Sequence, residues 1–221
     1  MAIYAQGYCG VMSKFTEEKE MKIAEVALQE FTTKGYKNTS TNVIAEKANV
    51  SKGLIFHYFH SKKKLFLLLL EDATDELVAH LKKQEQADEQ ADFFEEIRIF
   101  LGNKIRVALE KPDAYAFMMT SFLQPPIELQ HEIHQLLAQK SSEIESFSDQ
   151  ALFRKLEKAP LREGLDREVV TTYIRLVLDS ISNHVIQLYQ NRVQELVESP
   201  EKVMDEVDTF LDMLQNGIYT K

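Results

Sequence analysis

The sequence predicts an all-α protein, with a three-helix domain at its N-terminus followed by a larger helical domain. Apolar residues recur at helical spacing through most of the chain. The 221 residues include only 7 Gly and 5 Pro, and these fall between the periodic segments, where helices are expected to end. We place the first domain at residues 14–60 and the second at 61–221, and expect residues 1–13 to be a disordered extension.

Three helices are expected before residue 61. The first runs from about Thr16 to Lys34, with an apolar stripe on one side, and Gly35 is expected to end it. Ser40 can cap a second helix that reaches about Ala48, because its hydroxyl can accept a hydrogen bond from a free N–H of the first turn. The third helix follows within a few residues, so the connection must be tight.

The turn between the second and third helices has suitable residues. Asn49 tolerates the left-handed conformation that a tight turn needs, and Ser51 is a good N-cap for the next helix. That helix is expected to bury Leu54, Ile55 and Tyr58 or Phe59, and to leave Lys52, Gly53, Phe56 and His57 nearer to solvent. This is the arrangement of a helix-turn-helix, whose second helix enters the major groove of DNA.

Positive charge is confined to this end of the chain. Residues 1–64 contain ten Lys, no Arg and six Glu, whereas the whole chain carries 26 basic and 35 acidic residues and a net charge of −9. The remainder should repel DNA, so attraction is expected only at the N-terminal end. Without arginine, the commonest partner of guanine, base reading would fall to Thr41, Asn42, Lys52 and His57.

The run from about Glu18 to Phe66 resembles the DNA-binding domain of the TetR family of bacterial transcriptional regulators. The similarity lies in AEVALQEFTTKGYKNTSTNVIAEKANVSKGLIFHYFHSKKKLF, about a fifth of the chain. Asn49 replaces the usual glycine of the turn, and Phe56 stands where many members have a tyrosine that meets a phosphate. Lys62 matches the family's lysine that grips the DNA backbone. The expected DNA-binding residues are Ser40, Thr41, Asn42, Ser51, Lys52, Gly53, Phe56, His57, Tyr58 and Lys62.

The second domain is expected to contain six helices. A fourth helix should begin near Ser61 and reach about Gln84, with the apolar run at 65–70 buried at its start. Residues 93–105 mark a fifth helix, and Pro112 opens a sixth. The remaining expected boundaries are Pro125 and Pro126 before a seventh helix, Asp166 as the cap of an eighth, and Ser199 with Pro200 before a ninth.

The last two helices are long and amphipathic, and the resemblance implies that they form a dimer interface. A two-fold dimer would set two recognition helices about 34–36 Å apart, as two half-sites require. The apolar stripe of the ninth helix includes Val207, Leu211 and Leu214. The other interpretation is that these stripes pack against their own domain.

The sixth helix, AYAFMMTSFL, is apolar on nearly all sides, which suits a pocket for a lipophilic molecule. The expected ligand-binding residues are Phe93, Phe100, Tyr115, Met118, Met119, Phe122, Ile133, Leu137, Tyr173 and Val177. The acidic excess favours cationic or neutral lipophiles, and fatty acyl compounds are the alternative. The same stripes would also make an ordinary core.

Catalysis has little support in the sequence. Glu128 and His131 have the spacing of a di-iron ligand pair, but no second pair accompanies them, so a solvated helix face is expected. We expect no catalytic residue, metal or cofactor. The lone Cys9 excludes an intrachain disulfide, and no apolar run approaches 18 residues, which agrees with a cytoplasmic protein. The helix-turn-helix, its lysines and the resemblance together predict a ligand-responsive repressor. The alternative is a helical carrier or enzyme that binds a lipophile or metal without binding DNA.

Overall fold

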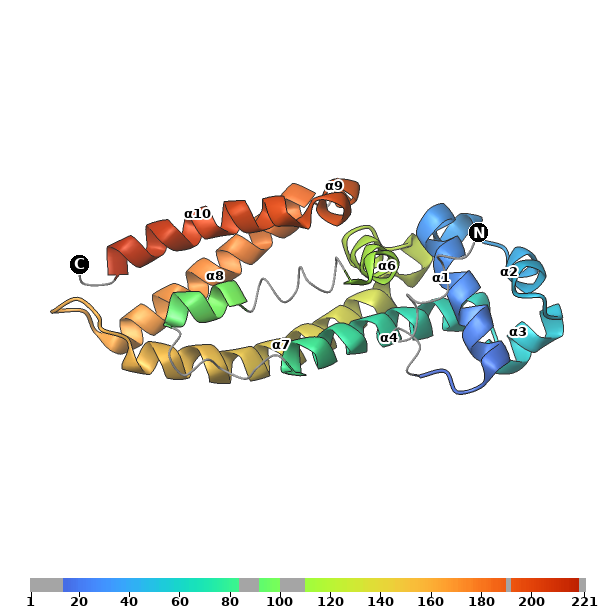
Figure 1. Ribbon diagram of the computed structural model, residues 1–221, viewed down its shortest axis with the longest axis horizontal. Helices are drawn as coiled ribbons and strands as arrows, with labels where there is room; N and C mark the ends of the chain where they lie inside the picture. Colours follow the sequence, from blue (N-terminus) through green and yellow to red (C-terminus); the bar gives the residue numbers. More distant parts are fainter. Residues whose placement is uncertain (1–13, 84–91, 100–109, 190–191, 219–221) are drawn as a thin grey trace. The chain divides into compact units, whose positions relative to one another are not determined.

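The computed structural model describes residues 14–83, 92–99, 110–189 and 192–218. Helices dominate these residues, as the sequence predicts (Figure 1). They form two compact units, one with residues 14–79 and 110–140, the other with 80–83, 92–99 and 141–218. The boundary between the units falls within α4 and α7.

The first unit begins with the three expected helices, which are α1 (Glu18–Asn38), α2 (Thr41–Ala48) and α3 (Lys52–Phe59). Gly35 interrupts α1, as expected, with φ 72° and ψ 167°, but the helix resumes for one short turn and ends at Asn38 rather than at Lys34. The positive φ suits glycine, which has no Cβ to oppose it. This turn brings the chain to the cap of α2.

The rest of the first unit comprises α4 (Lys62–Lys83), α6 (Pro112–Leu123), a 3₁₀ turn at Ile127–Leu129, and the start of α7 (Gln130–Lys158). The prolines begin and end these helices where the sequence predicts. The expected buried start of α4 is confirmed, since Leu65, Phe66, Leu69 and Leu70 are all buried.

An aromatic group joins α1, α4 and α6 in the core of the first unit. The ring of Phe66 in α4 lies 5.0 Å from Phe31 of α1 and 5.0 Å from Phe117 of α6. Tyr36, near the end of α1, lies 5.2 Å from Phe66. Each buried phenylalanine contributes about 1.5–3 kcal/mol through removal from water. The three helices are therefore one packed body, and α6 is in direct contact with α1.

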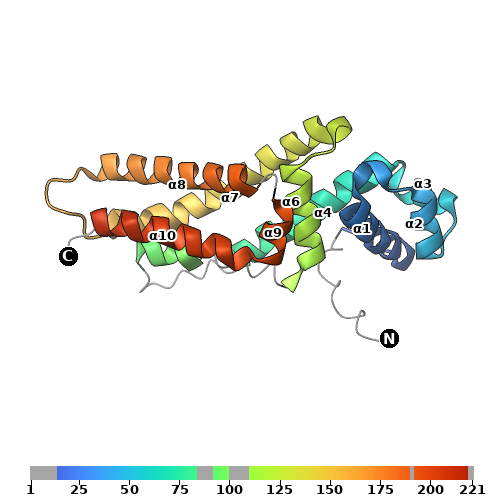
Figure 2. The same cartoon turned by 90° about the horizontal axis from the view of Figure 1, so that it is seen from above.

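The second unit contains a helical segment at 93–99, the remainder of α7, and the helices α8 (Arg167–Tyr189), α9 (Val193–Glu198) and α10 (Pro200–Ile218). Asp166 caps α8 as expected, because its carboxylate accepts a hydrogen bond from the Val169 N–H at 3.0 Å. α8 and α10 run side by side in opposite directions, with α9 between them in the chain (Figures 1 and 2). The short helix α9 was not expected from the sequence.

Candidate nucleic-acid interface

Two serine caps and one asparagine set the geometry of the α2–α3 turn. The Ser40 hydroxyl accepts a hydrogen bond from the Asn42 N–H, and the Ser51 hydroxyl accepts one from the Leu54 N–H, both at 3.3 Å. Asn49 has φ 55° and ψ 47°, the left-handed conformation expected of it. These residues form the predicted helix-turn-helix.

The outer face of α3 is open to solvent. Lys52, Gly53, Phe56 and His57 are exposed, with 42% of Phe56 accessible, whereas Ile55 and Phe59 are buried. The Lys52 Nζ lies 5.9 Å from the centre of the Phe56 ring, so cation and aromatic ring share this face. A Cβ added to Gly53 would meet only the Ser51 hydroxyl, at 3.9 Å. Packing within the protein therefore does not require this glycine, and its bare backbone is available to an approaching surface.

The start of α2 lies open as well. Ser40 and Asn42 are exposed and Thr41 is half-buried. Exposed N–H groups and hydroxyls at a helix N-terminus are suited to phosphate contact. Tyr58 is half-buried at the end of α3, and its hydroxyl donates to the Glu17 carboxylate at 2.5 Å. That hydrogen bond, with some burial, raises the pKa of Tyr58.

Lys62 opens α4, and its ammonium group is directed at the protein. It donates to the main-chain oxygens of Tyr36, at 2.9 Å, and Thr39, at 3.1 Å. Its Nζ also lies 4.3 Å from the centre of the Tyr36 ring. The next residue, Lys63, forms an ion pair with Glu132 at the start of α7. Sequence reasoning found Lys62 but not its partners, which are distant in the chain.

Glu30 joins α1 to α2 of the helix-turn-helix, and sequence reasoning did not predict this role. It is buried in α1 and accepts hydrogen bonds from Lys34, at 2.6 Å, and from Lys47 of α2, at 2.5 Å. Burial opposes ionisation, but the two ammonium groups outweigh it and lower the pKa of Glu30. The only signal in the sequence is an acidic residue in an otherwise apolar stripe, four residues before a lysine.

Further ion pairs tie α4 to its neighbours in the first unit. Asp75 accepts from Lys14 at 2.7 Å and pairs with Lys140 of α7, and Glu76 pairs with Lys111 just before α6. Burial alone would raise the pKa of Asp75, but the hydrogen bonds from the two lysines have the larger opposite effect. The pKa of Asp75 is therefore lowered overall. α4 is thus held by charge as well as by apolar packing.

The expected ligand-binding residues occupy both units. Met118 and Ile133 are buried in the core of the first unit, where Tyr115, Met119 and Phe122 pack against them. Burial raises the pKa of Tyr115 to about 12. Leu137 is half-buried in the same unit. In the second unit, Phe93 is buried, Val177 packs on its core and Tyr173 is exposed. Phe100 lies outside the described residues.

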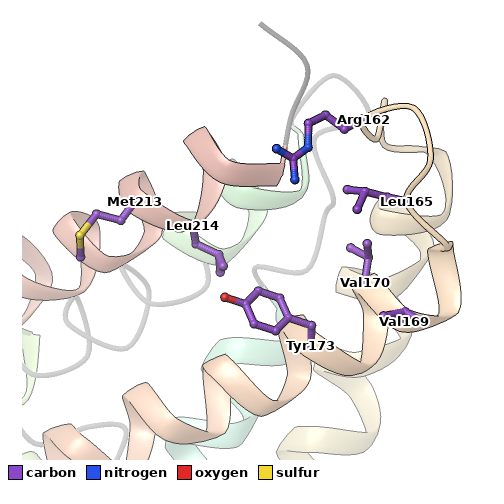
Figure 3. Close-up of a pocket in the computed structure, with 7 residues that line it drawn as sticks. All are labelled: Arg162, Leu165, Val169, Val170, Tyr173, Met213 and Leu214. Carbon is purple, nitrogen blue, oxygen red and sulfur yellow. The ribbon is translucent and has the colours of Figure 1, made fainter.

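A cavity of about 360 Å³ lies in the second unit, between α8, α10 and the loop before α8 (Figure 3). Among the expected ligand-binding residues that the structure describes, only Tyr173 lines it. Its other lining residues are Arg162, Leu165, Val169, Val170, Met213 and Leu214. Several of these apolar side chains are largely exposed, including Val169 at 66% and Met213 at 60%.

The described residues give no support to a metal centre. Within them, no group of three or more potential metal ligands comes together. Glu128 and His131 are both exposed, as a solvated helix face predicts. In these parts of the chain, no helix is long and apolar enough to cross a membrane.

Comparison with known proteins agrees with this geometry. The family model of bacterial regulatory proteins, tetR family, matches residues 23–69. The helix-turn-helix-type transcriptional regulator YuxN of Bacillus subtilis is 25% identical over 217 residues, with 91% of this chain and 73% of its own length covered. A fatty acid metabolism regulator protein of the same organism is 22% identical over 186 residues, covering 77% of this chain and 93% of its own.

Solved structures share the fold. The transcriptional regulator FadR of Bacillus subtilis, in complex with stearoyl-CoA, superposes with a TM-score of 0.57 at 19% identity, covering 84% of this chain and 95% of its own. The helix-turn-helix, its caps and these similarities together define a DNA-binding transcriptional regulator. Residues 23–69 are thus similar to the DNA-binding domain of the TetR family.

Proposed function

We propose that this protein is a repressor that binds a pseudo-palindromic operator as a homodimer and leaves it when a fatty acyl compound binds. The observation that carries the proposal is the outer face of α3. There Lys52, Phe56 and His57 are exposed beside the bare backbone of Gly53, on a helix held by two caps and a left-handed turn. An exposed cation, an aromatic ring and an open backbone suit groove contact.

Contact with DNA extends to the first turn of α2. The exposed side chains of Ser40 and Asn42, with Thr41, would meet the phosphates that flank the groove, while Ser51 caps the helix that reads it. Tyr58 is the last expected contact, and its hydroxyl would have to exchange Glu17 for DNA. With several phosphate contacts in each protomer, affinity should fall steeply as salt rises.

The apolar face of α8 supports a dimer. Val169, Tyr173 and Leu176 are each more than half exposed, and Met213 of α10 lies near them at the cavity. Large side chains of this kind, grouped on one helix, favour an interface over contact with water. The stripe of α10 is different, because Val207, Leu211 and Leu214 are buried within the second unit. This stripe of α10 is therefore not available for the expected dimer interface, and only the exposed side of α10 could take part in it.

The effector class rests on α6 and on the relatives. α6 carries Met118, Met119 and Phe122, which form an adaptable apolar surface packed toward α1 and α4. A ligand that separates these helices would disturb the body that holds the helix-turn-helix. One relative is named for fatty acid metabolism, and FadR was solved with stearoyl-CoA. A fatty acyl compound is therefore preferred to a cationic or neutral lipophile.

Selection of genomic fragments with the purified protein tests DNA binding and yields the operator. Release from that operator is then measured with acyl-CoAs of several chain lengths, with free fatty acids, and with neutral and cationic lipophiles. Met119→Ala and Phe122→Ala should blunt the response to the effective compound and leave operator affinity unchanged. If no genomic fragment is enriched, DNA binding is excluded. If only cationic or neutral compounds act, the acyl assignment is wrong.

A further inference from the structure

The ammonium group of Lys62 lies at a junction of three helices. It donates to the main-chain oxygens of Tyr36 and Thr39, which belong to the last turn of α1 and to the residue that follows it. Thr39 directly precedes Ser40, the cap of α2. Lys62 itself is the first residue of α4. One side chain therefore connects the end of α1, the start of α2 and the start of α4.

Few groups other than Lys62 can donate hydrogen bonds to the carbonyls at this junction. The chain leaves helical geometry at Gly35, so the last carbonyls of α1 lack partners along the helix. The Thr39 hydroxyl is occupied, because its single hydrogen is shared between Glu30 O, at 3.0 Å, and Gly35 O, at 2.8 Å. The Tyr36 carbonyl accepts a long hydrogen bond from the Thr39 N–H, at 3.4 Å, and both it and the Thr39 carbonyl accept from Lys62. Hydrogen bonds from a charged donor are stronger than those between neutral groups.

The Tyr36 ring completes the arrangement. It is buried against Phe31, at 6.0 Å, and Phe66, at 5.2 Å, and it presents its face to the Lys62 ammonium at 4.3 Å. A cation over an aromatic face is attracted to it. An ammonium has three N–H donors, and two of them are engaged by the carbonyls. The group is directed into the protein more than toward a ligand.

We propose that Lys62 is a positioning residue, which serves operator binding by fixing the α1–α2 corner and so the Ser40–Asn42 contacts, and not by binding a phosphate. This inference rests on the proposed function, since it assumes that the first turn of α2 meets DNA. A phosphate contact adds affinity for every DNA sequence alike. A positioning residue sets the register of the helix-turn-helix, so its loss damages the specific complex far more than the non-specific one.

The test uses the full-length protein with its selected operator and with a scrambled duplex of equal length. Lys62→Met keeps the aliphatic stem and removes the ammonium group. We expect operator affinity to fall by roughly tenfold or more, the size of effect seen when a charge-assisted hydrogen bond is lost. Affinity for the scrambled duplex should change little, and the dependence of log Kd on log salt should keep its slope. Loss of one phosphate contact per protomer would instead reduce that slope by about 0.9 for each.

Two further variants separate the explanations. Thr39→Val loosens the same corner without changing any charge, so it should reproduce the selective loss, and its effect should not add to that of Lys62→Met. Lys64→Met removes a charge from the same turn of α4 without touching the corner, and it measures how much one lost charge matters there. Helix content and melting temperature are compared for all variants, because only folded protein is informative.

Equal weakening of both duplexes by Lys62→Met, with a shallower salt dependence, would overturn the proposal in favour of a phosphate contact. Additive effects of Lys62→Met and Thr39→Val would overturn it as well. So would an unchanged operator affinity. If Lys62→Met does not fold, the affinities of Thr39→Val for the operator and for the scrambled duplex decide between the two explanations. If the wild-type protein selects no operator, the proposed function fails.

Discussion

Single residues decide whether the α2–α3 turn closes. Asn49 has φ 55° and ψ 47°, a conformation that glycine adopts freely and that asparagine tolerates better than other residues. Its N–H reaches Glu46 O at 3.1 Å, and the Val50 N–H reaches Ala45 O at 2.9 Å. Asparagine can therefore do here what the family's usual glycine does.

Substitution at Asn49 should separate backbone conformation from side-chain chemistry. Asn49→Gly should change the free energy of unfolding by less than about 0.5 kcal/mol, because glycine accepts a positive φ. Asn49→Ala should lower it by about 1–2 kcal/mol, since a Cβ opposes that conformation. Urea denaturation of the three proteins measures both changes. Equal losses in both variants would mean that the asparagine side chain, not the backbone, matters at this turn.

Glu30 makes the α1–α2 contact sensitive to acid. Its folded-state pKa is lowered from 4.5, so its ionised form stabilises the fold fully above about pH 4.5, and that contribution is lost as pH falls through the lowered value. Glu30→Gln should remove about 1–2 kcal/mol at neutral pH, because Lys34 and Lys47 are half-exposed and can return to water. Its stability should also decline less as pH falls below about 4.5. Parallel curves for wild type and variant, from denaturation at several pH values, would exclude this role.

Most helices could be predicted from the sequence, whereas the contacts that each helix makes could not. Ser40, Ser51, Asp166 and Pro200 start helices through local geometry, so sequence alone located them. Leu211 could not be assigned from its pattern, because a helix stripe looks the same whether it faces a core or a second subunit. The long-range contacts of Glu30, Lys62 and Lys63 depend on the folded chain. The turn that follows Gly35 and the short helix α9 lack a strong local signal.

An ion pair joins the start of α7 to the start of α4. Lys63 is exposed and pairs with Glu132, whose pKa is lowered by the hydrogen bond from that lysine. Lys63 lies among the consecutive lysines at 62–64, so if these contact DNA we expect Glu132 to compete with phosphate for it. α7 also carries Ile133, which is buried in the same core as Phe117 and Met118 of α6. We expect a change in that core to alter how strongly α7 holds Lys63.

Removal of this competitor should strengthen DNA binding. Glu132→Gln should raise operator affinity about two- to fivefold, the range of an exposed ion pair, and should steepen the salt dependence. Glu128→Gln is the matched control, since it removes a neighbouring exposed carboxylate that forms none of the described ion pairs. Lys63→Gln added to Glu132→Gln should cancel the gain. Weaker binding by Glu132→Gln would mean that the ion pair supports the DNA-binding arrangement.

At the scale of the whole molecule, the proposed operator recognition depends on two protomers. One helix-turn-helix reads a short half-site, and a two-fold pair reads two half-sites about 34–36 Å apart. The second unit divides its apolar residues between two uses. Val207, Leu211 and Ile174 are buried in its own core, whereas Val169, Leu176 and Met213 remain exposed. The exposed set is available for a second copy.

Charged substitutions should distinguish these two uses. Val169→Glu with Leu176→Glu places carboxylates on side chains that are 66% and 62% exposed, so each protomer should keep its fold and melting temperature while the dimer dissociates. Such a monomer should lose operator affinity by orders of magnitude but keep weak non-specific binding, because the helix-turn-helix is intact. Leu211→Glu should act differently, since Leu211 is fully buried and a charge there should unfold the second unit.

Glu168→Gln is the control for a charge change on α8, because Glu168 is an exposed and already polar neighbour of Val169. Light scattering gives the mass of each variant, circular dichroism its helix content, and anisotropy its affinity for operator. We expect a folded monomer for the double variant and a folded dimer for the control. A double variant that stays dimeric and operator-bound would place the interface elsewhere on the protein. A double variant that unfolds would mean that these side chains stabilise the protomer itself, and their exposure would need another explanation.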